Sequence, residues 1–209
     1  MSWFLAPFYD RIVAGQEAAY FGRFRAELLG ELAGEVVEIG AGTGLNLRHY
    51  GPGVTHLHVC EPDSGMRKQL EVRLAALPEL AAKTTVHEAP GEGLPFEDDR
   101  FDAAVSTLVL CTVRGLDESI AELHRVLKPG GTFSFLEHVC APKGTWTRRW
   151  QHIVEPVYTP IAGGCRLTRS QDEAIAAGGF DLERLECKAI GGGVGMVLHT
   201  VRGVGVKSG

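Results

Sequence analysis

The apolar positions of the chain fall into short runs rich in β-branched residues, separated by stretches in which apolar residues recur at helical intervals. Runs of the first kind are typical of strands, and spacing of the second kind is typical of helices. Several runs are almost wholly apolar, which indicates strands covered on both faces, as in a parallel sheet. We therefore expect an α/β fold. The expected strands are, in chain order, 36–39, 56–60, 84–88, 101–108 (with apolar character continuing through 109–113), 132–137, 181–189 and 196–206.

Helical spacing and the stop signals of proline and glycine predict the elements between these runs. The segment 9–33 carries Tyr20, Phe24 and Leu28 at helical intervals before Gly34, and should form one or two helices. Residues 138–169 have no strand or helix pattern of ordinary length, so we expect an insert there. The remaining helices are expected at 45–50, 61–77, 117–126 and 170–178.

The first apolar run ends in a loop with a glycine at every second position, Gly40, Gly42 and Gly44. Such a loop suits a backbone that takes unusual dihedral angles or approaches a bound molecule closely. Dinucleotide folds use G-x-G-x-x-G, which would require glycine where this chain has Leu45. A cofactor with an adenosine and no phosphates fits this spacing better. A tight turn that binds nothing is the alternative.

An acidic residue also stands where a ribose is expected. The run 56–60 stops at Glu61, seventeen positions after Gly44. A carboxylate at the end of the second strand can accept hydrogen bonds from both ribose hydroxyls.

Composition narrows the class of protein. The chain has 209 residues, enough for one sizeable domain, and its 44% hydrophobic and 22% charged content is ordinary for a soluble protein. Its net charge of −5 argues against nucleic acid as the main partner. We predict a single domain over 1–209.

The cysteines and the N-terminal residues indicate in which cellular compartment the protein is expected. Five scattered cysteines without C-x-x-C spacing suggest neither a disulfide framework nor a zinc site, so we expect no metal and a reducing cytoplasm. Residues 2–8 are apolar but lack a basic n-region, and Pro7 interrupts them. We therefore expect no integral membrane segment.

The segment E-I-G-A-G-T-G, followed by an acidic strand end, resembles motifs I and II of the class I S-adenosylmethionine-dependent methyltransferases. The turn L-K-P-G-G-x-F at 127–133 resembles a frequent turn of the same family. The resemblance implies a three-layer Rossmann-like fold with a mostly parallel seven-stranded sheet and an antiparallel last strand. It also implies S-adenosylmethionine as cofactor, S-adenosylhomocysteine as product, a helical lid over 1–33 and an acceptor pocket in 138–169.

The same resemblance implies which residues meet the cofactor. The run E-G-L-P-F at 92–96 resembles the family's motif III, although Pro90 stands where that motif has Asp, so the adenine amino group would meet Glu92 or a carbonyl. The implied cofactor-binding residues are Glu38, Gly40, Ala41, Gly42, Thr43, Gly44, Glu61, Pro62, Gly91, Glu92, Thr107 and Leu108.

Four further blocks resemble a narrower group, the methyltransferase-like thiol methyltransferases of animals and their bacterial relatives. The blocks are T-L-V-L-C at 107–111, F-L-E-H-V at 135–139, W-Q-x-x-x-E-P at 150–156 and G-C-R-L-T-R at 164–169. They imply a small-molecule thiol as acceptor. N-methylation of an amine, heteroaromatic or phospholipid head group remains an alternative, as do C-methylation of a quinone ring and a silent, cofactor-binding regulator or scaffold. The sequence leaves the oligomeric state open.

Methyl transfer from a sulfonium is an in-line displacement, so positioning does most of the work. A thiol acceptor reacts as its thiolate, which a nearby base would generate. His138 is the expected base, with a structural hydrogen bond at a strand end as the alternative. Cys111 lies where the acceptor pocket should begin and is a reactive or a merely packed thiol. Glu137 is expected to orient His138 or a loop amide.

Overall fold

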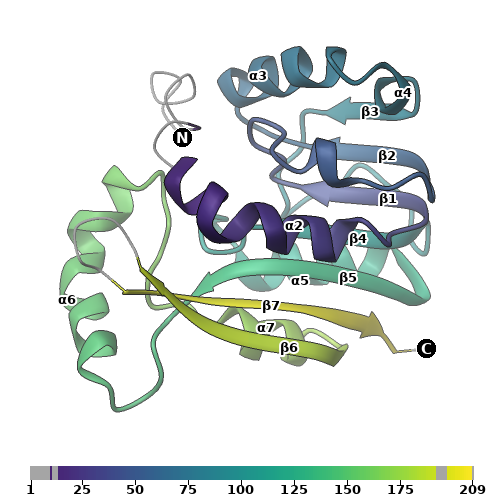
Figure 1. The fold of residues 1–209 in the computed structure, drawn as a ribbon. Helices are drawn as coiled ribbons and strands as arrows, with labels where there is room; N and C mark the ends of the chain where they lie inside the picture. Colours follow the sequence, from purple (N-terminus) through teal and green to yellow (C-terminus); the bar gives the residue numbers. More distant parts are fainter. Residues whose placement is uncertain (1–9, 11–13, 192–196, 209) are drawn as a thin grey trace.

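The computed structural model describes residue 10, residues 14–191 and residues 197–208, and its centre is a seven-stranded sheet (Figure 1). The strand order is β3-β2-β1-β4-β5-β7-β6. The strands are β1 (Gly34–Ile39), β2 (Val54–Cys60), β3 (Thr84–His87), β4 (Phe101–Thr107), β5 (Leu127–Val139), β6 (Phe180–Gly191) and β7 (Val197–Lys207).

The pairing confirms the predicted sheet. Strands β1 to β5 run parallel, whereas β7 is antiparallel to both β5 and β6. In the register of the sheet, Ile39 at the end of β1 stands between Cys60 of β2 and Ser106 of β4. The loops that follow these three strands therefore meet at one edge. Chain order reverses between β1 and β4, and ligands of open α/β sheets bind at such a reversal.

Helices cover both faces of the sheet and complete the three layers. One core cluster joins β1, β4 and β5 to α5 and α7, and a second joins β1, β2 and β4 to α2 and α3. Alternate residues of one strand supply the two clusters, Ala104 the first and Ala103 and Val105 the second. In Figure 1, α2 crosses in front of the sheet while α5 lies behind it. The helices are η1 (Glu17–Phe21), α2 (Gly22–Leu29), η2 (Leu47–His49), α3 (Ser64–Ala75), α4 (Pro78–Ala81), α5 (Leu116–Val126), α6 (Trp146–Ile161) and α7 (Gln171–Ala177).

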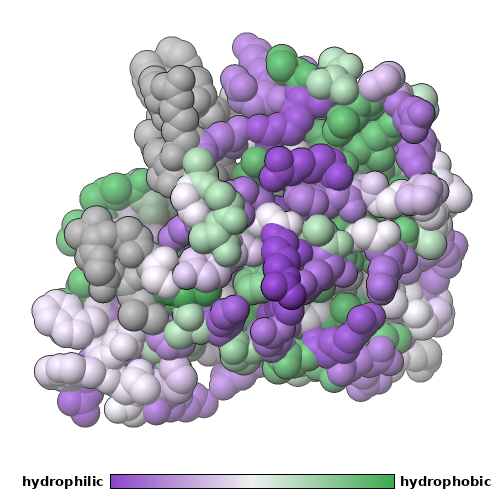
Figure 2. Space-filling view, viewed as in Figure 1, coloured by the Kyte–Doolittle hydropathy of each residue, from purple (hydrophilic) through white to green (hydrophobic). Residues whose placement is uncertain are grey.

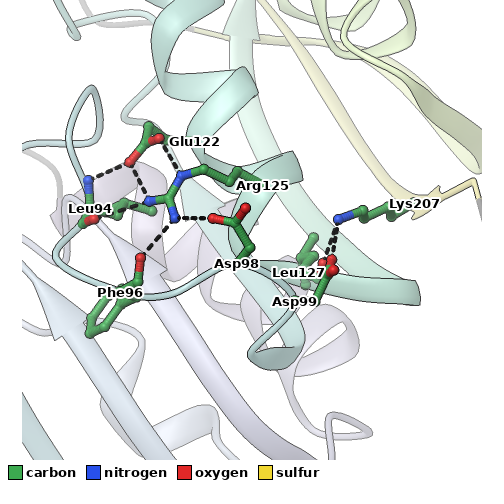
Figure 3. Close-up of polar contacts among 8 residues, drawn as sticks. All are labelled: Leu94, Phe96, Asp98, Asp99, Glu122, Arg125, Leu127 and Lys207. Atoms are coloured by element: carbon green, nitrogen blue, oxygen red, sulfur yellow. Dashed lines mark hydrogen bonds and ion pairs between the residues drawn. The ribbon is translucent and has the colours of Figure 1, made fainter.

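The loop before β4 is fixed by a polar cluster centred on Arg125 of α5 (Figure 3). Its guanidinium donates to the carbonyls of Phe96 at 2.8 Å and Leu94 at 3.1 Å and pairs with Glu122. Glu122 in turn accepts from the backbone N–H of Leu94 at 2.7 Å. This cluster holds the chain that leads out of the segment 90–92, which lines the pocket described below.

Two expectations for local structure are wrong. The helix expected over 45–50 is only the single 3₁₀ turn η2, because six residues between Gly44 and Gly51 are too few for a stable α-helix. The fourth strand does not reach 108–113. It ends at Thr107, since Leu108 takes a φ of 59°, which breaks the extended backbone.

The insert 138–169 is also more regular than expected, because it contains the sixteen-residue helix α6. Thr145 caps this helix by accepting a hydrogen bond from the N–H of Arg148 at 3.2 Å. Pro156 and Pro160 lie inside the helix, and internal prolines usually predict against one. They obscured an apolar spacing that is otherwise helical.

The N-terminal helices are confirmed as η1 and α2. Residues 1–9, together with residues 192 and 193 between the last two expected strands, lie outside the described part of the chain. No helix in that part combines the length and apolarity that crossing a bilayer requires.

Candidate functional site

A large pocket opens where the carboxyl ends of β1, β2 and β4 meet. Its volume is about 1730 Å³, enough for a cofactor and an acceptor side by side. The glycine loop and Glu61 line one end, and His138, Tyr158 and Cys165 line the other. The segments 90–92 and 107–109 line the same pocket.

The glycine loop has the backbone that its sequence predicts. Gly40, Gly42 and Gly44 take φ values of 57°, 57° and 83°, in the left-handed region that favours glycine. A Cβ on Gly40 would stand 2.5 Å from the side chain of Val109, so that glycine is needed for packing. A Cβ on Gly42 would meet only the Gly40 carbonyl, at 3.9 Å. The loop therefore leaves open space above Gly42.

Glu61 ties the second strand to this loop. One carboxylate oxygen accepts from the N–H of Gly42 at 2.8 Å, and the other accepts from the N–H of Asp63 at 2.8 Å. Burial raises the pKa of Glu61, and the two backbone donors oppose that rise. Each oxygen keeps a lone pair for a further donor, as a ribose hydroxyl would be.

A buried arginine side chain, Arg25, lies near the glycine loop. The sequence analysis does not predict it as a site residue. Arg25 of α2 is only 4% exposed and lines the pocket. Its guanidinium donates to Asn46 at 2.6 Å, to Thr107 at 2.8 Å and to Glu17 at 3.1 Å. Arginine is rarely buried without such partners, and a planar guanidinium suits a carboxylate ligand. Nothing in the sequence distinguishes Arg25 from Arg23, which lies on the same helix and is exposed.

Glu38 belongs to the same network. Its carboxylate accepts from Asn46 at 2.8 Å and from the Tyr50 hydroxyl at 2.6 Å, and burial raises its pKa. Thr107 accepts from both Asn46 and Arg25. Glu38 is 1% exposed and does not line the pocket, and Asn46 connects it to the lining residues Arg25 and Thr107.

The remaining predicted cofactor residues surround the same space. Ala41, Thr43, Pro62, Gly91, Glu92 and Leu108 all line the pocket. One oxygen of Glu92 accepts from the N–H groups of Arg114 and Gly115, at 2.7 and 3.1 Å, and so holds the turn before α5. Thr43 donates to Asp10 at 2.7 Å, which brings the start of the described chain onto the loop.

Glu137 organises the turn that follows β4. This turn lies at the end of the pocket that His138 and Cys165 line, which we call the acceptor end. Glu137 is fully buried, accepts from the Ser106 hydroxyl and, at 3.2 Å, from the N–H of Val109, and does not line the pocket. Burial raises its pKa to about 7, although Ser106 and the backbone amides of 109–111 lower it. Leu108, with its positive φ, begins this turn and faces the pocket. Glu137 therefore contacts a loop amide, one of its two expected roles.

His138, Cys165 and Cys111 come together at the far end of the pocket. Nδ1 of His138 lies 3.6 Å from Sγ of Cys165, while Nε2 is buried and has no hydrogen-bond partner among the described residues. The Cys111 thiol, and then His138, lower the pKa of Cys165 against the effect of burial. The same contact raises the pKa of Cys111 well above its usual range. The contact between the two thiols therefore favours the ionised form at Cys165 and the thiol form at Cys111.

Comparison with known sequences gives the family of this site. Residues 37–135 match the family described as "Methyltransferase domain". Thiol S-methyltransferase TMT1B of Homo sapiens is 35% identical over 168 residues, which are 79% of this chain and 67% of that protein. This chain is a class I S-adenosylmethionine-dependent methyltransferase. Its cofactor is therefore S-adenosylmethionine.

Two further similarities extend the comparison. Thiol S-methyltransferase TMT1A of Homo sapiens is 35% identical over 72% of this methyltransferase, and the match spans 62% of the human protein. A solved structure of geranyl diphosphate methyltransferase in complex with S-adenosylmethionine has a TM-score of 0.69 at 14% identity. It covers 90% of this chain and 84% of its own, and it shows the shared fold.

The glycine loop and Glu61 fit the adenosyl and methionyl parts of this cofactor. Open space above Gly42 leaves room for a ligand against the backbone, and Glu61 offers free lone pairs for ribose hydroxyls. Arg25 presents a positive charge from below, which suits the methionine carboxylate. In this methyltransferase the cofactor end and the thiol–histidine end therefore belong to one continuous pocket.

Proposed function

We propose that this methyltransferase transfers the methyl group of S-adenosylmethionine to the sulfur of a small thiol. The observation that carries the proposal is the imidazole of His138, which lines the pocket with one buried nitrogen unpartnered within the described ranges. The human relatives, both described as thiol S-methyltransferases, support the same acceptor class.

In this proposal Cys165 sets the tautomer of the His138 imidazole. With its lowered pKa, Cys165 is a thiolate that accepts a hydrogen bond from Nδ1–H of His138. Nε2 then keeps its lone pair and can accept a proton. The arrangement resembles the way an anion orients the histidine of a hydrolase triad. Cys111, held as a thiol by its raised pKa, stabilises the Cys165 thiolate.

In the proposed reaction, Nε2 of His138 takes the acceptor's thiol proton as the thiolate forms. The thiolate attacks the methyl carbon of the sulfonium, a new C–S bond forms, and the old C–S bond breaks. The electron pair of the broken C–S bond remains on the cofactor sulfur. This sulfur thereby loses its positive charge, and the product is S-adenosylhomocysteine. The proton on His138 is then lost to solvent. Flat apolar acceptors suit the half-buried Tyr158 at this end of the pocket.

The test compares acceptors of different acidity. The wild-type protein is screened with thiols, amines, phospholipid head groups and quinols, and turnover is read as S-adenosylhomocysteine produced. We expect thiols to be turned over, and we expect the highest rate with aryl thiols. His138→Asn should slow a thiol of high pKa by about a hundredfold or more, and slow one already ionised at the assay pH far less. His152→Asn, at an exposed position outside the pocket, is the matched control.

Two outcomes would overturn the proposal. Turnover of amines or quinols with none of any thiol would exclude S-methylation. An equal loss of rate on both thiols in His138→Asn would show that this residue has a structural role and does not remove a proton.

The five free cysteines also favour a reducing, cytoplasmic location. A helical lid formed by 1–33 remains part of the proposal.

A further inference from the structure

Helix α6 turns its apolar side chains outward. Five large apolar residues follow a helical spacing of three or four, and they are more exposed than any core residue: Trp146 (70%), Trp150 (55%), Ile153 (66%), Val157 (68%) and Ile161 (72%). In the described part of the chain, only Val72 and Leu185 are comparable, and they lie singly on other elements. Figure 1 shows α6 at the edge of the molecule, and Figure 2 shows green and near-white surface along that edge. We call these five residues the α6 stripe.

The inner side of α6 is polar instead. Gln151 is 4% exposed and accepts from the N–H of Ala141 at 2.7 Å. Glu155 accepts from the N–H of Thr168 at 2.7 Å. Specific hydrogen bonds therefore fix the rotation of the helix, which keeps the α6 stripe in water. A solvated stripe of this length marks an interaction surface.

The segment that contains α6 has a net charge opposite in sign to that of the whole chain. Residues 140–169 contain five basic residues and one acidic residue, a net charge of +4 in a chain of net charge −5. Arg149 is exposed and lies 5.5 Å from the ring of Trp146. An apolar stripe with tryptophans at one end and basic residues beside it is typical of helices that lie in the interface of anionic membranes.

We propose that the α6 stripe docks this methyltransferase on the surface of an anionic bilayer. The positive charge of residues 140–169 favours an anionic bilayer over a second copy of the chain as the partner. A two-fold dimer through the stripe would bring two segments of net charge +4 together, and such like charges oppose each other. An anionic leaflet attracts the same segment.

The orientation follows from the position of α6 beside the pocket. Tyr158 and Ile161 belong to the helix and also line the pocket, as do the next residues, Ala162 and Gly163. A bilayer against the stripe therefore faces the acceptor end of the pocket. Acceptors that partition into lipid would reach the pocket from the bilayer.

The first experiment measures binding of the full chain to vesicles. Trp3→Phe leaves Trp146 and Trp150 as the only tryptophans. Mixing with vesicles of phosphatidylcholine and phosphatidylglycerol should shift their emission to the blue, and brominated lipids should quench it. Vesicles of phosphatidylcholine alone should bind at least about tenfold more weakly, and salt should reduce the difference.

The second experiment tests the stripe itself by co-sedimentation. The double variant Trp150→Ser with Ile153→Ser should bind anionic vesicles at least about tenfold more weakly than the wild type. Its control is Val72→Ser, an equally exposed apolar residue on α3. Arg149→Gln should weaken binding to anionic vesicles only, and Lys68→Gln, exposed on α3, should not. Circular dichroism and S-adenosylmethionine binding verify folding, because none of these residues lines the pocket.

Three results would overturn the proposal. The wild type does not bind anionic vesicles at low salt; the stripe variant binds as well as Val72→Ser; or sedimentation velocity shows a dimer that the stripe variant dissociates, without any binding to vesicles. Because vesicle binding needs no acceptor, none of these results depends on thiol methylation.

Discussion

The buried carboxyl of Glu137 should make the stability of this methyltransferase fall as the pH rises. Burial raises its pKa from the ordinary 4.5 to about 7. Between these values the folded state holds a proton that the unfolded state has lost, so the free energy of unfolding decreases with increasing pH. The difference corresponds to about 3 kcal/mol, because one pKa unit is worth about 1.4 kcal/mol.

Glu137→Gln isolates this effect. The amide oxygen can still accept from Ser106 and from the N–H of Val109, which are the partners of one carboxylate oxygen in the wild type. Urea unfolding of both proteins between about pH 5 and about pH 8 gives the difference in free energy at each pH. Relative to the wild type, the variant should gain about 3 kcal/mol across that range. Histidines that titrate in the same range cancel in the difference.

The control is Glu31→Gln, because Glu31 is exposed and its curve should run parallel to that of the wild type. If the Glu137→Gln and wild-type curves are also parallel, the carboxyl does not titrate near neutral pH, and the account of the 108–111 turn is wrong. A gain confined to low pH would refute it equally.

The other predictions concern the pocket and the loop that borders it. Glu61→Ala should weaken S-adenosylmethionine binding by about 1 to 3 kcal/mol in calorimetry, since the loop loses a charged acceptor. Arg25→Met should weaken S-adenosylmethionine more than adenosine, because only the former has the methionine carboxylate that the guanidinium suits. Deleting 1–15 should leave the sheet folded but lower turnover if this segment covers the pocket. Arg125→Met should reduce the free energy of unfolding by about 1 to 2 kcal/mol in urea, since the Leu94 and Phe96 carbonyls lose their partly buried donor.

Much of the cofactor end could be predicted because its signals are local. The strand 36–39, the three glycines and Glu61 each carry a short-range pattern with a physical meaning, and the structure brings them to one edge of the sheet. Arg25 could not be found this way. Its partners Asn46 and Thr107 are 21 and 82 positions away, and only the packing of α2 against the sheet brings them together.

The acceptor end was harder to predict for two reasons. Leu108 ends β4 by a left-handed backbone, and a leucine gives no signal of that conformation. The N–H of the next residue, Val109, donates to Glu137, which belongs to another strand. In α6 the prolines counted against a helix although the cap at Thr145 and the spacing of the apolar residues favoured one.

Those two prolines also limit how far α6 can leave water. Proline has no N–H, so the carbonyls of His152 and Pro156, four residues before Pro156 and Pro160, lack their usual helical donors. In hydrocarbon each unsatisfied carbonyl would cost several kcal/mol. Hydrating them requires that the helix axis stay at the level of the lipid head groups, with only the stripe side chains reaching the acyl chains. The two prolines therefore limit how deeply α6 can enter the bilayer, so the proposed attachment of the protein to the membrane is shallow and reversible.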